Sequence, residues 1–83
     1  MRVTIDAGSR RDAELIAAAL PGGAEVTSRR GYGFVRLRLR DRQQLQDLLA
    51  IIAECVKDHG LPWARLRCGD EEWMLRGARP RIS

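Results

Sequence analysis

The chain has 83 residues, with a hydrophobic fraction of 45% and a charged fraction of 31%. This length supports one domain with one modest core, and this composition argues against a wholly disordered chain. The formal net charge is +4, and fourteen of the fifteen basic residues are arginine. The arginine excess has two interpretations: the codon usage of a GC-rich genome, or an anionic partner that guanidinium groups would contact.

The first part of the chain predicts a strand and a helix. Polar and apolar side chains alternate over residues 2–6, which indicates a half-buried strand. Ser9 is a typical helix N-cap, and an apolar stripe at helical spacing follows it as far as Leu20. The run Pro21-Gly22-Gly23 predicts the end of this helix.

A hairpin is predicted next. Residues 24–28 form a short candidate strand, Arg29-Arg30-Gly31 the turn, and residues 32–40 a longer strand with strict alternation. One face of the longer strand carries Val35, Leu37 and Leu39. The other face carries Phe34, Arg36, Arg38 and Arg40.

The second half predicts a helix and a strand that returns along the sheet. Asp41 is the expected N-cap of a helix that ends at Gly60, a typical C′ residue. Residues 63–68 alternate again, and residues 71–75 form a possible last strand after a Gly69-Asp70 turn. The pattern does not decide between a hairpin and one bent strand over residues 63–76.

The order β-α-β-β-α-β predicts an α+β fold of the ferredoxin-like kind, with an antiparallel sheet and two helices on one face. A further strand of a C-terminal hairpin is possible in this scheme. We expect a single domain over residues 1–76, followed by a flexible basic tail over residues 77–83. The second face of the sheet is expected to be open.

No catalytic constellation is evident. His59 is the only histidine, and Cys55 and Cys68 are the only cysteines. These groups do not make a triad or a four-ligand zinc site at ordinary spacing. We therefore expect a protein that is not an enzyme and that uses no metal and no cofactor. The sequence shows no signal peptide and no membrane span, which predicts a cytoplasmic location.

The segment Arg30-Gly31-Tyr32-Gly33-Phe34-Val35-Arg36-Leu37 resembles the RNP1 octamer of the RNA recognition motif family, K/R-G-F/Y-G/A-F-V-x-F/Y. Six of the seven specified positions agree, and Leu37 replaces the last aromatic residue. The family carries this octamer on the third strand of the same fold. The resemblance implies that Tyr32 and Phe34 stack on bases or riboses and that Arg30 contacts phosphate. On the first strand, Thr4 stands where the family normally has a ring.

The open face of the sheet is the predicted binding surface. Its candidate residues combine arginines and aromatic rings: Arg30, Tyr32, Phe34, Arg36, Arg38, Arg40, Trp63, Arg65 and Arg67. Such a mixture is typical of protein–protein hot spots, which predicts an interaction or assembly module and allows a homodimer. It is also typical of surfaces that bind single-stranded nucleic acid, which is the alternative.

Overall fold

The computed structural model describes residues 1–22 and 24–77. Residues 78–83 of the predicted tail lie outside that part. The elements in chain order are β1 (Arg2–Ala7), α1 (Arg10–Ala19), β2 (Glu25–Arg29), β3 (Tyr32–Arg38), α2 (Arg42–Asp58), β4 (Trp63–Cys68) and β5 (Glu71–Arg76).

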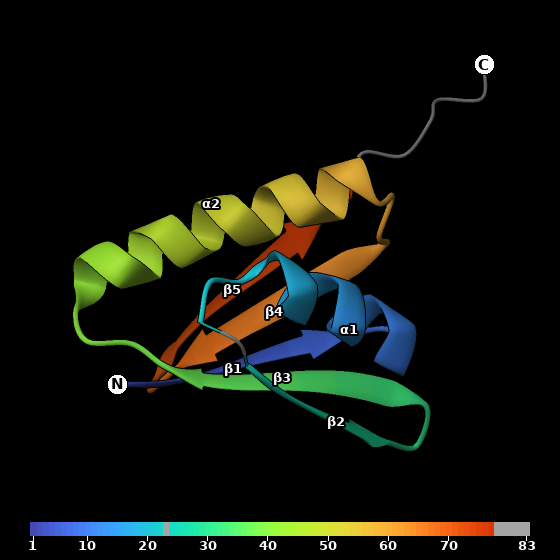
Figure 1. The fold of residues 1–83 in the computed structure, drawn as a ribbon, viewed down its shortest axis with the longest axis horizontal. Coiled ribbons are helices and arrows are strands. Elements are labelled where there is room, and N and C mark those ends of the chain that lie inside the picture. The colour runs from blue at the N-terminus through green and yellow to red at the C-terminus, as the bar shows by residue number, and fades with distance from the viewer. Residues whose placement is uncertain (23, 78–83) are drawn as a thin grey trace.

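The strands form one antiparallel sheet in the order β2-β3-β1-β4-β5. The first four strands have the ferredoxin-like arrangement, in which β1 lies between β3 and β4. The fifth strand extends the sheet beyond β4 through a hairpin. Both helices cover the same face, with α1 over β3 and its neighbours β2 and β1, and α2 beside β4 and β5 (Figure 1). The predicted fold is confirmed, and residues 63–76 form a hairpin.

The core lies between the helices and the inner face of the sheet. Alternation sends one side of each central strand inward, and the helices contribute their apolar stripes. The largest fully buried side chains are Val3, Ile5, Ile16, Val35, Leu45, Ile52 and Leu66. Because the inner face takes up these side chains, the polar side chains of the same strands are left on the opposite face.

Local side-chain bonds set the helix ends. The Ser9 hydroxyl accepts a hydrogen bond from the Asp12 backbone N–H at 3.1 Å, and the Asp41 carboxylate accepts one from Gln44 at 3.0 Å. Both predicted N-caps are confirmed. Gly60 has φ +63° just after α2, where a left-handed residue lets the chain turn back.

Three predicted boundaries in the β2–β3 hairpin are wrong, beginning with the first strand, which starts at Glu25 and not at residue 24. Arg29 belongs to β2, so the turn contains only Arg30 and Gly31, both at positive φ, as a tight hairpin requires. The next strand ends at Arg38, so Arg40 lies outside it. The Arg40 N–H donates to the Gln44 side chain at 2.6 Å, because the chain there is already turning into α2.

A side-chain ion pair joins the β4–β5 hairpin, close to the hairpin turn, to the start of α2. The Arg42 guanidinium donates two hydrogen bonds to the Glu71 carboxylate, at 2.9 and 3.1 Å. This pairing lowers the pKa of Glu71 from its ordinary value of 4.5. The bond ties the start of α2 to the start of β5, although both side chains are exposed to solvent.

Replacing Glu71 with glutamine is expected to lower the melting temperature slightly at neutral pH, with a difference that shrinks in acid. Because the folded-state pKa is lowered, the ionised carboxylate contributes stability above pH 4.5. That contribution is lost as the pH falls through the folded pKa. Thermal unfolding at several pH values tests this, with Glu54→Gln on exposed helix surface as control. A difference that does not change with pH would contradict the ion pair.

Candidate functional site

The open face brings together predicted residues from strands that are far apart in the sequence. Alternation directs Tyr32, Phe34, Arg36 and Arg38 of β3, and Trp63, Arg65 and Arg67 of β4, away from the helices. Between these strands lies β1. Its Asp6 pairs in register with Phe34 on one side and Arg65 on the other, and its Thr4 pairs with Arg36 and Arg67.

Asp6 is the centre of this face. Its side chain points to the open side of the sheet, yet the residue is only 2% exposed. One carboxylate oxygen accepts hydrogen bonds from Nε and Nη2 of Arg65 at 2.9 and 2.6 Å. The other accepts from Nη2 of Arg67 at 3.0 Å. The two guanidinium groups thus cover the carboxylate, and a buried charge is fully paired.

This cluster divides the arginines of the face into two groups. The β4 pair is bound to Asp6, and Arg65 also lies 3.4 Å from the Glu72 carboxylate. The hydrogen bond to Asp6 raises the pKa of Arg65, so this guanidinium stays charged. In contrast, Arg36 and Arg38 of β3 have no ion-pair partner among the described residues. Arg76 of β5 also lacks an ion-pair partner among the described residues, so the arginines available to a ligand lie on β3 and β5 and not on β4.

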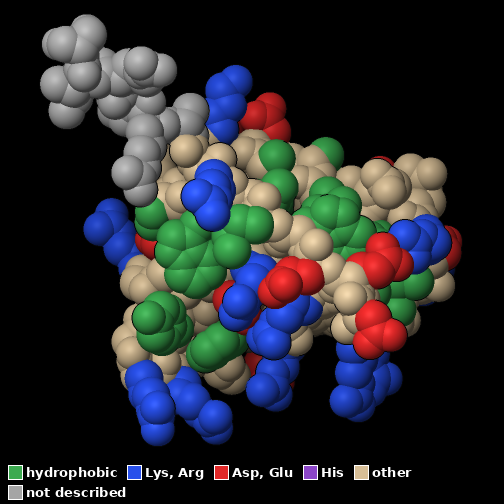
Figure 2. Space-filling view, turned by 180° about the vertical axis from the view of Figure 1, so that it is seen from behind, with side chains coloured by type: hydrophobic (Ala, Val, Ile, Leu, Met, Phe, Trp, Pro, Cys, Tyr) green, Lys and Arg blue, Asp and Glu red, His purple; other side chains and the backbone are tan. Residues whose placement is uncertain are grey.

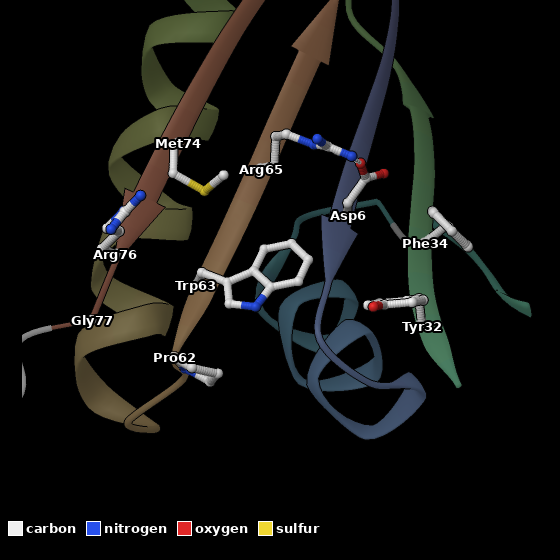
Figure 3. A pocket seen from close by; sticks show the side chains of 9 residues that line it. All are labelled: Asp6, Tyr32, Phe34, Pro62, Trp63, Arg65, Met74, Arg76 and Gly77. Atoms are coloured by element: carbon white, nitrogen blue, oxygen red, sulfur yellow. Dashed lines mark hydrogen bonds and ion pairs between the residues drawn. The ribbon is translucent and has the colours of Figure 1, made fainter. Parts of the chain in front are cut away.

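A hollow of about 780 Å³ opens on the same face, which we call the aromatic hollow (Figure 3). Its lining comes from the ends of four strands and the residues beside them: Asp6, Tyr32, Phe34, Pro62, Trp63, Arg65, Met74, Arg76 and Gly77. In Figure 3, Tyr32 and Phe34 stand on one side, Met74 and Arg76 on the other, and the indole of Trp63 lies between them.

The hollow exists because β1 is short at this end. Its last paired residue is Ala7, opposite Gly33 and Ala64, while β3 and β4 continue to Tyr32 and Trp63. Gly8 follows β1 and has no side chain to fill the space. A Cβ atom there would lie 3.6 Å from Nε1 of Trp63. The indole therefore rests over a glycine.

The rings of the aromatic hollow are open to solvent to different degrees. Tyr32 is 52% exposed and Met74 is 47% exposed, whereas Phe34 and Trp63 are half-buried. Phe34 also borders a second hollow of about 400 Å³, the basic hollow, lined by Thr4, Thr27, Ser28, Arg29, Phe34, Arg36 and Arg67. One ring thus separates an apolar depression from a basic one. Figure 2 shows apolar side chains gathered on this face and basic ones projecting along its border.

Sequence reasoning missed part of the site. Met74 and Arg76 were not predicted, although alternation along β5 would have placed them on the open face once the hairpin was known. The pairing of Asp6 with Arg65 and Arg67 was also not predicted, because it depends on the register of β1 against β4. Three predicted residues line neither the aromatic hollow nor the basic hollow: Arg30 in the hairpin turn, Arg38 at the end of β3 and Arg40 beyond it.

Other reactive groups do not assemble into a site. No group of three potential metal-binding side chains occurs within residues 1–22 and 24–77. Cys55 is buried in α2, and burial raises the pKa of its thiol, which keeps it in the less reactive protonated form. His59 is exposed at the end of α2. In the described part of the chain, neither helix is long and apolar enough to cross a membrane.

No family model, curated protein or solved structure matches the chain. The resemblance of residues 30–37 to the RNP1 octamer therefore stays a prediction. What the described part of the molecule offers is a sheet face with three rings, several arginines outside ion pairs and a paired central carboxylate. The function has to be inferred from these groups.

Proposed function

We propose that this protein binds single-stranded nucleic acid, RNA in particular, on the open face of its sheet. The observation that carries the proposal is the position of Phe34, which lies between the aromatic hollow and the basic hollow. A flexible strand can place a base on one side of this ring and its phosphate on the other. Neither a deep catalytic cleft nor a base-pairing groove is needed for such binding.

Stacking would supply part of the affinity. Tyr32, Phe34 and Trp63 come from two strands and share one depression, so consecutive unpaired bases can meet successive rings. Base–aromatic stacking contributes about 1–3 kcal/mol per base and tolerates any sequence, because every base has a π face. The exposed ring of Tyr32 is the most accessible of the three.

Charge would supply the rest. Arg36 lines the basic hollow, and Arg38 follows it on the same face of β3. Phosphate contacts by such side chains position a strand without reading its sequence. Arg65 and Arg67 already form ion pairs with Asp6, so they are expected to contribute less to phosphate binding. The expected path of the backbone is therefore along β3, with bases directed toward β4.

A protein partner is the alternative that the same residues permit, since arginine and aromatic side chains also dominate protein–protein hot spots. An acidic peptide would be attracted to Arg36 and Arg38 in the same way. Such a peptide need not present a ring to each of the three aromatic side chains, whereas every nucleotide of a strand carries a base that can stack. The test below therefore depends on the rings as well as on the charge.

Removing single rings is expected to weaken binding of a short unstructured RNA strongly. Phe34→Ala and Tyr32→Ala should each raise the dissociation constant about 5- to 150-fold, through the loss of roughly 1–3 kcal/mol of stacking. Fluorescence anisotropy with labelled RNA and single-stranded DNA measures this, and circular dichroism checks folding. Phe34→Leu, which keeps an apolar side chain without a ring, should behave like Phe34→Ala. Binding that is unchanged in all three variants would refute the proposed surface.

The arginines provide the matched control for that titration. Arg36→Gln should make the slope of log affinity against log salt concentration shallower by about 0.7. This is the contribution of one phosphate contact on a single strand. Arg67→Gln should change it less, because Asp6 already pairs with that guanidinium. Arg11→Gln, on exposed α1 surface, should leave it unchanged. Equal effects of all three would indicate nonspecific attraction to a basic protein.

A further inference from the structure

The outer edge of β5 is a sheet edge with which no described residue pairs. Strand order places β5 at one end of the sheet and β2 at the other. An open edge presents unpaired backbone N–H and C=O groups, and proteins usually shorten, cover or charge such edges. β5 has six residues, so it offers an edge of ordinary strand length.

The hydrogen-bond pattern identifies the residues that face this edge. A two-residue turn at Gly69-Asp70 joins β4 and β5, and Cys68 faces Glu71 across it as the closing pair. Further along, the Gly77 N–H donates to the Pro62 carbonyl at 3.3 Å. Odd-numbered residues of β5 therefore direct their backbone groups toward β4. The even-numbered residues Glu72, Met74 and Arg76 direct theirs outward.

The sequence of β5 is complementary to itself when two copies run antiparallel. With Met74 on a twofold axis, Glu72 of one copy faces Arg76 of the other, on both sides of the axis. Trp73 then faces Leu75. This register pairs the outward-directed backbone groups of Glu72, Met74 and Arg76. It also places opposite charges across each end, whereas like charges there would oppose pairing of the two edges.

The middle of the strand is apolar and incompletely covered. Met74 is 47% exposed on the open face, and Trp73 and Leu75 are half-buried at the margin of the core, on the helix side. Pairing would cover all three side chains on both copies. The β2 edge is also charge-complementary, with Glu25 and Arg29 about Thr27, but its middle, Val26-Thr27-Ser28, has one apolar side chain where the middle of β5 has three.

We propose that the protein forms a homodimer by antiparallel pairing of its β5 edges, centred on Met74. The partner is a second copy of this chain, and the product is a continuous ten-stranded sheet. A twofold axis normal to the sheet keeps both pairs of helices on one side and both open faces on the other. Met74 and Arg76 also line the aromatic hollow, so the two hollows would lie near the axis on one shared face. This inference does not require the proposed ligand.

The molar mass in solution tests the dimer directly. Light scattering behind size exclusion, supported by sedimentation equilibrium, should give twice the chain mass of 9.4 kDa for the parent protein. Glu72→Arg and Arg76→Glu should each raise the dimer dissociation constant about tenfold or more, because the symmetry replaces two attractive pairs with two repulsive ones. An equimolar mixture of the two variants should dimerise again, and so should the doubly exchanged chain.

Several results would overturn the proposal. One is a parent chain that stays monomeric up to about 1 mM, since a dimer weaker than that has no useful population. Another is a dimer unaffected by both β5 variants but disrupted by Glu25→Arg, which would assign the contact to β2. A third is failure of the mixture to recover while each variant is folded by circular dichroism. Because the readout is mass, loss of nucleic-acid binding alone would leave this inference standing.

Discussion

Replacing Gly33 with alanine is expected to destabilise the protein by about 3 kcal/mol, the upper end of ordinary overpacking. A Cβ atom at this position would lie 2.3 Å from the Ser9 carbonyl oxygen and 2.6 Å from the Ala13 Cβ. Both belong to the start of α1, where Ser9 is the N-cap. No flexible side chain can move aside, so the helix would have to shift away from the sheet.

The neighbouring glycine is the control. Gly31→Ala adds a methyl group with nothing within 4 Å, but at φ +85°, so it should cost only about 1 kcal/mol of backbone strain. Urea unfolding followed by tryptophan fluorescence measures both variants. Equal losses would contradict the close approach of α1 to β3. Both glycines belong to the RNP1-like octamer, and Gly33 is required there by packing, whatever the ligand.

Replacing Asp6 with asparagine is expected to cost roughly 1.5–3 kcal/mol, the range for hydrogen bonds to charged groups. The carboxylate accepts three such bonds from Arg65 and Arg67. Asparagine keeps the shape but removes the charge and one acceptor, and it leaves two guanidinium groups side by side. Denaturant unfolding measures the loss, with Asp58→Asn on exposed helix surface as the control, which should change stability little.

The same variant has a second expected effect, on binding. Release of Arg65 and Arg67 makes two more positive charges available, so affinity for RNA should rise at low salt and fall more steeply as salt increases. A titration at several salt concentrations checks this. A stability loss together with an unchanged salt dependence would show that the two arginines do not reach the ligand even when they are free.

Local features of the sequence determined the elements. The period of two in β1, β3 and β4 was readable because each of these strands has one buried and one open face. Ser9 and Asp41 marked the helix starts because a cap bonds a backbone N–H only three residues away. The candidate rings Phe34 and Trp63 followed from alternation, and Tyr32 followed from the resemblance to the RNP1 octamer.

Only the tertiary structure determined which side chains of different elements come into contact. Asp6 pairs with arginines 59 and 61 residues away, which depends on the register of β1 against β4. The aromatic hollow depends on β1 ending before its neighbours, and the free edge depends on β5 extending the sheet. Spacing along a chain specifies which face a side chain takes. Only the packing of distant strands specifies its neighbours, and those neighbours set both charge and shape on the open face.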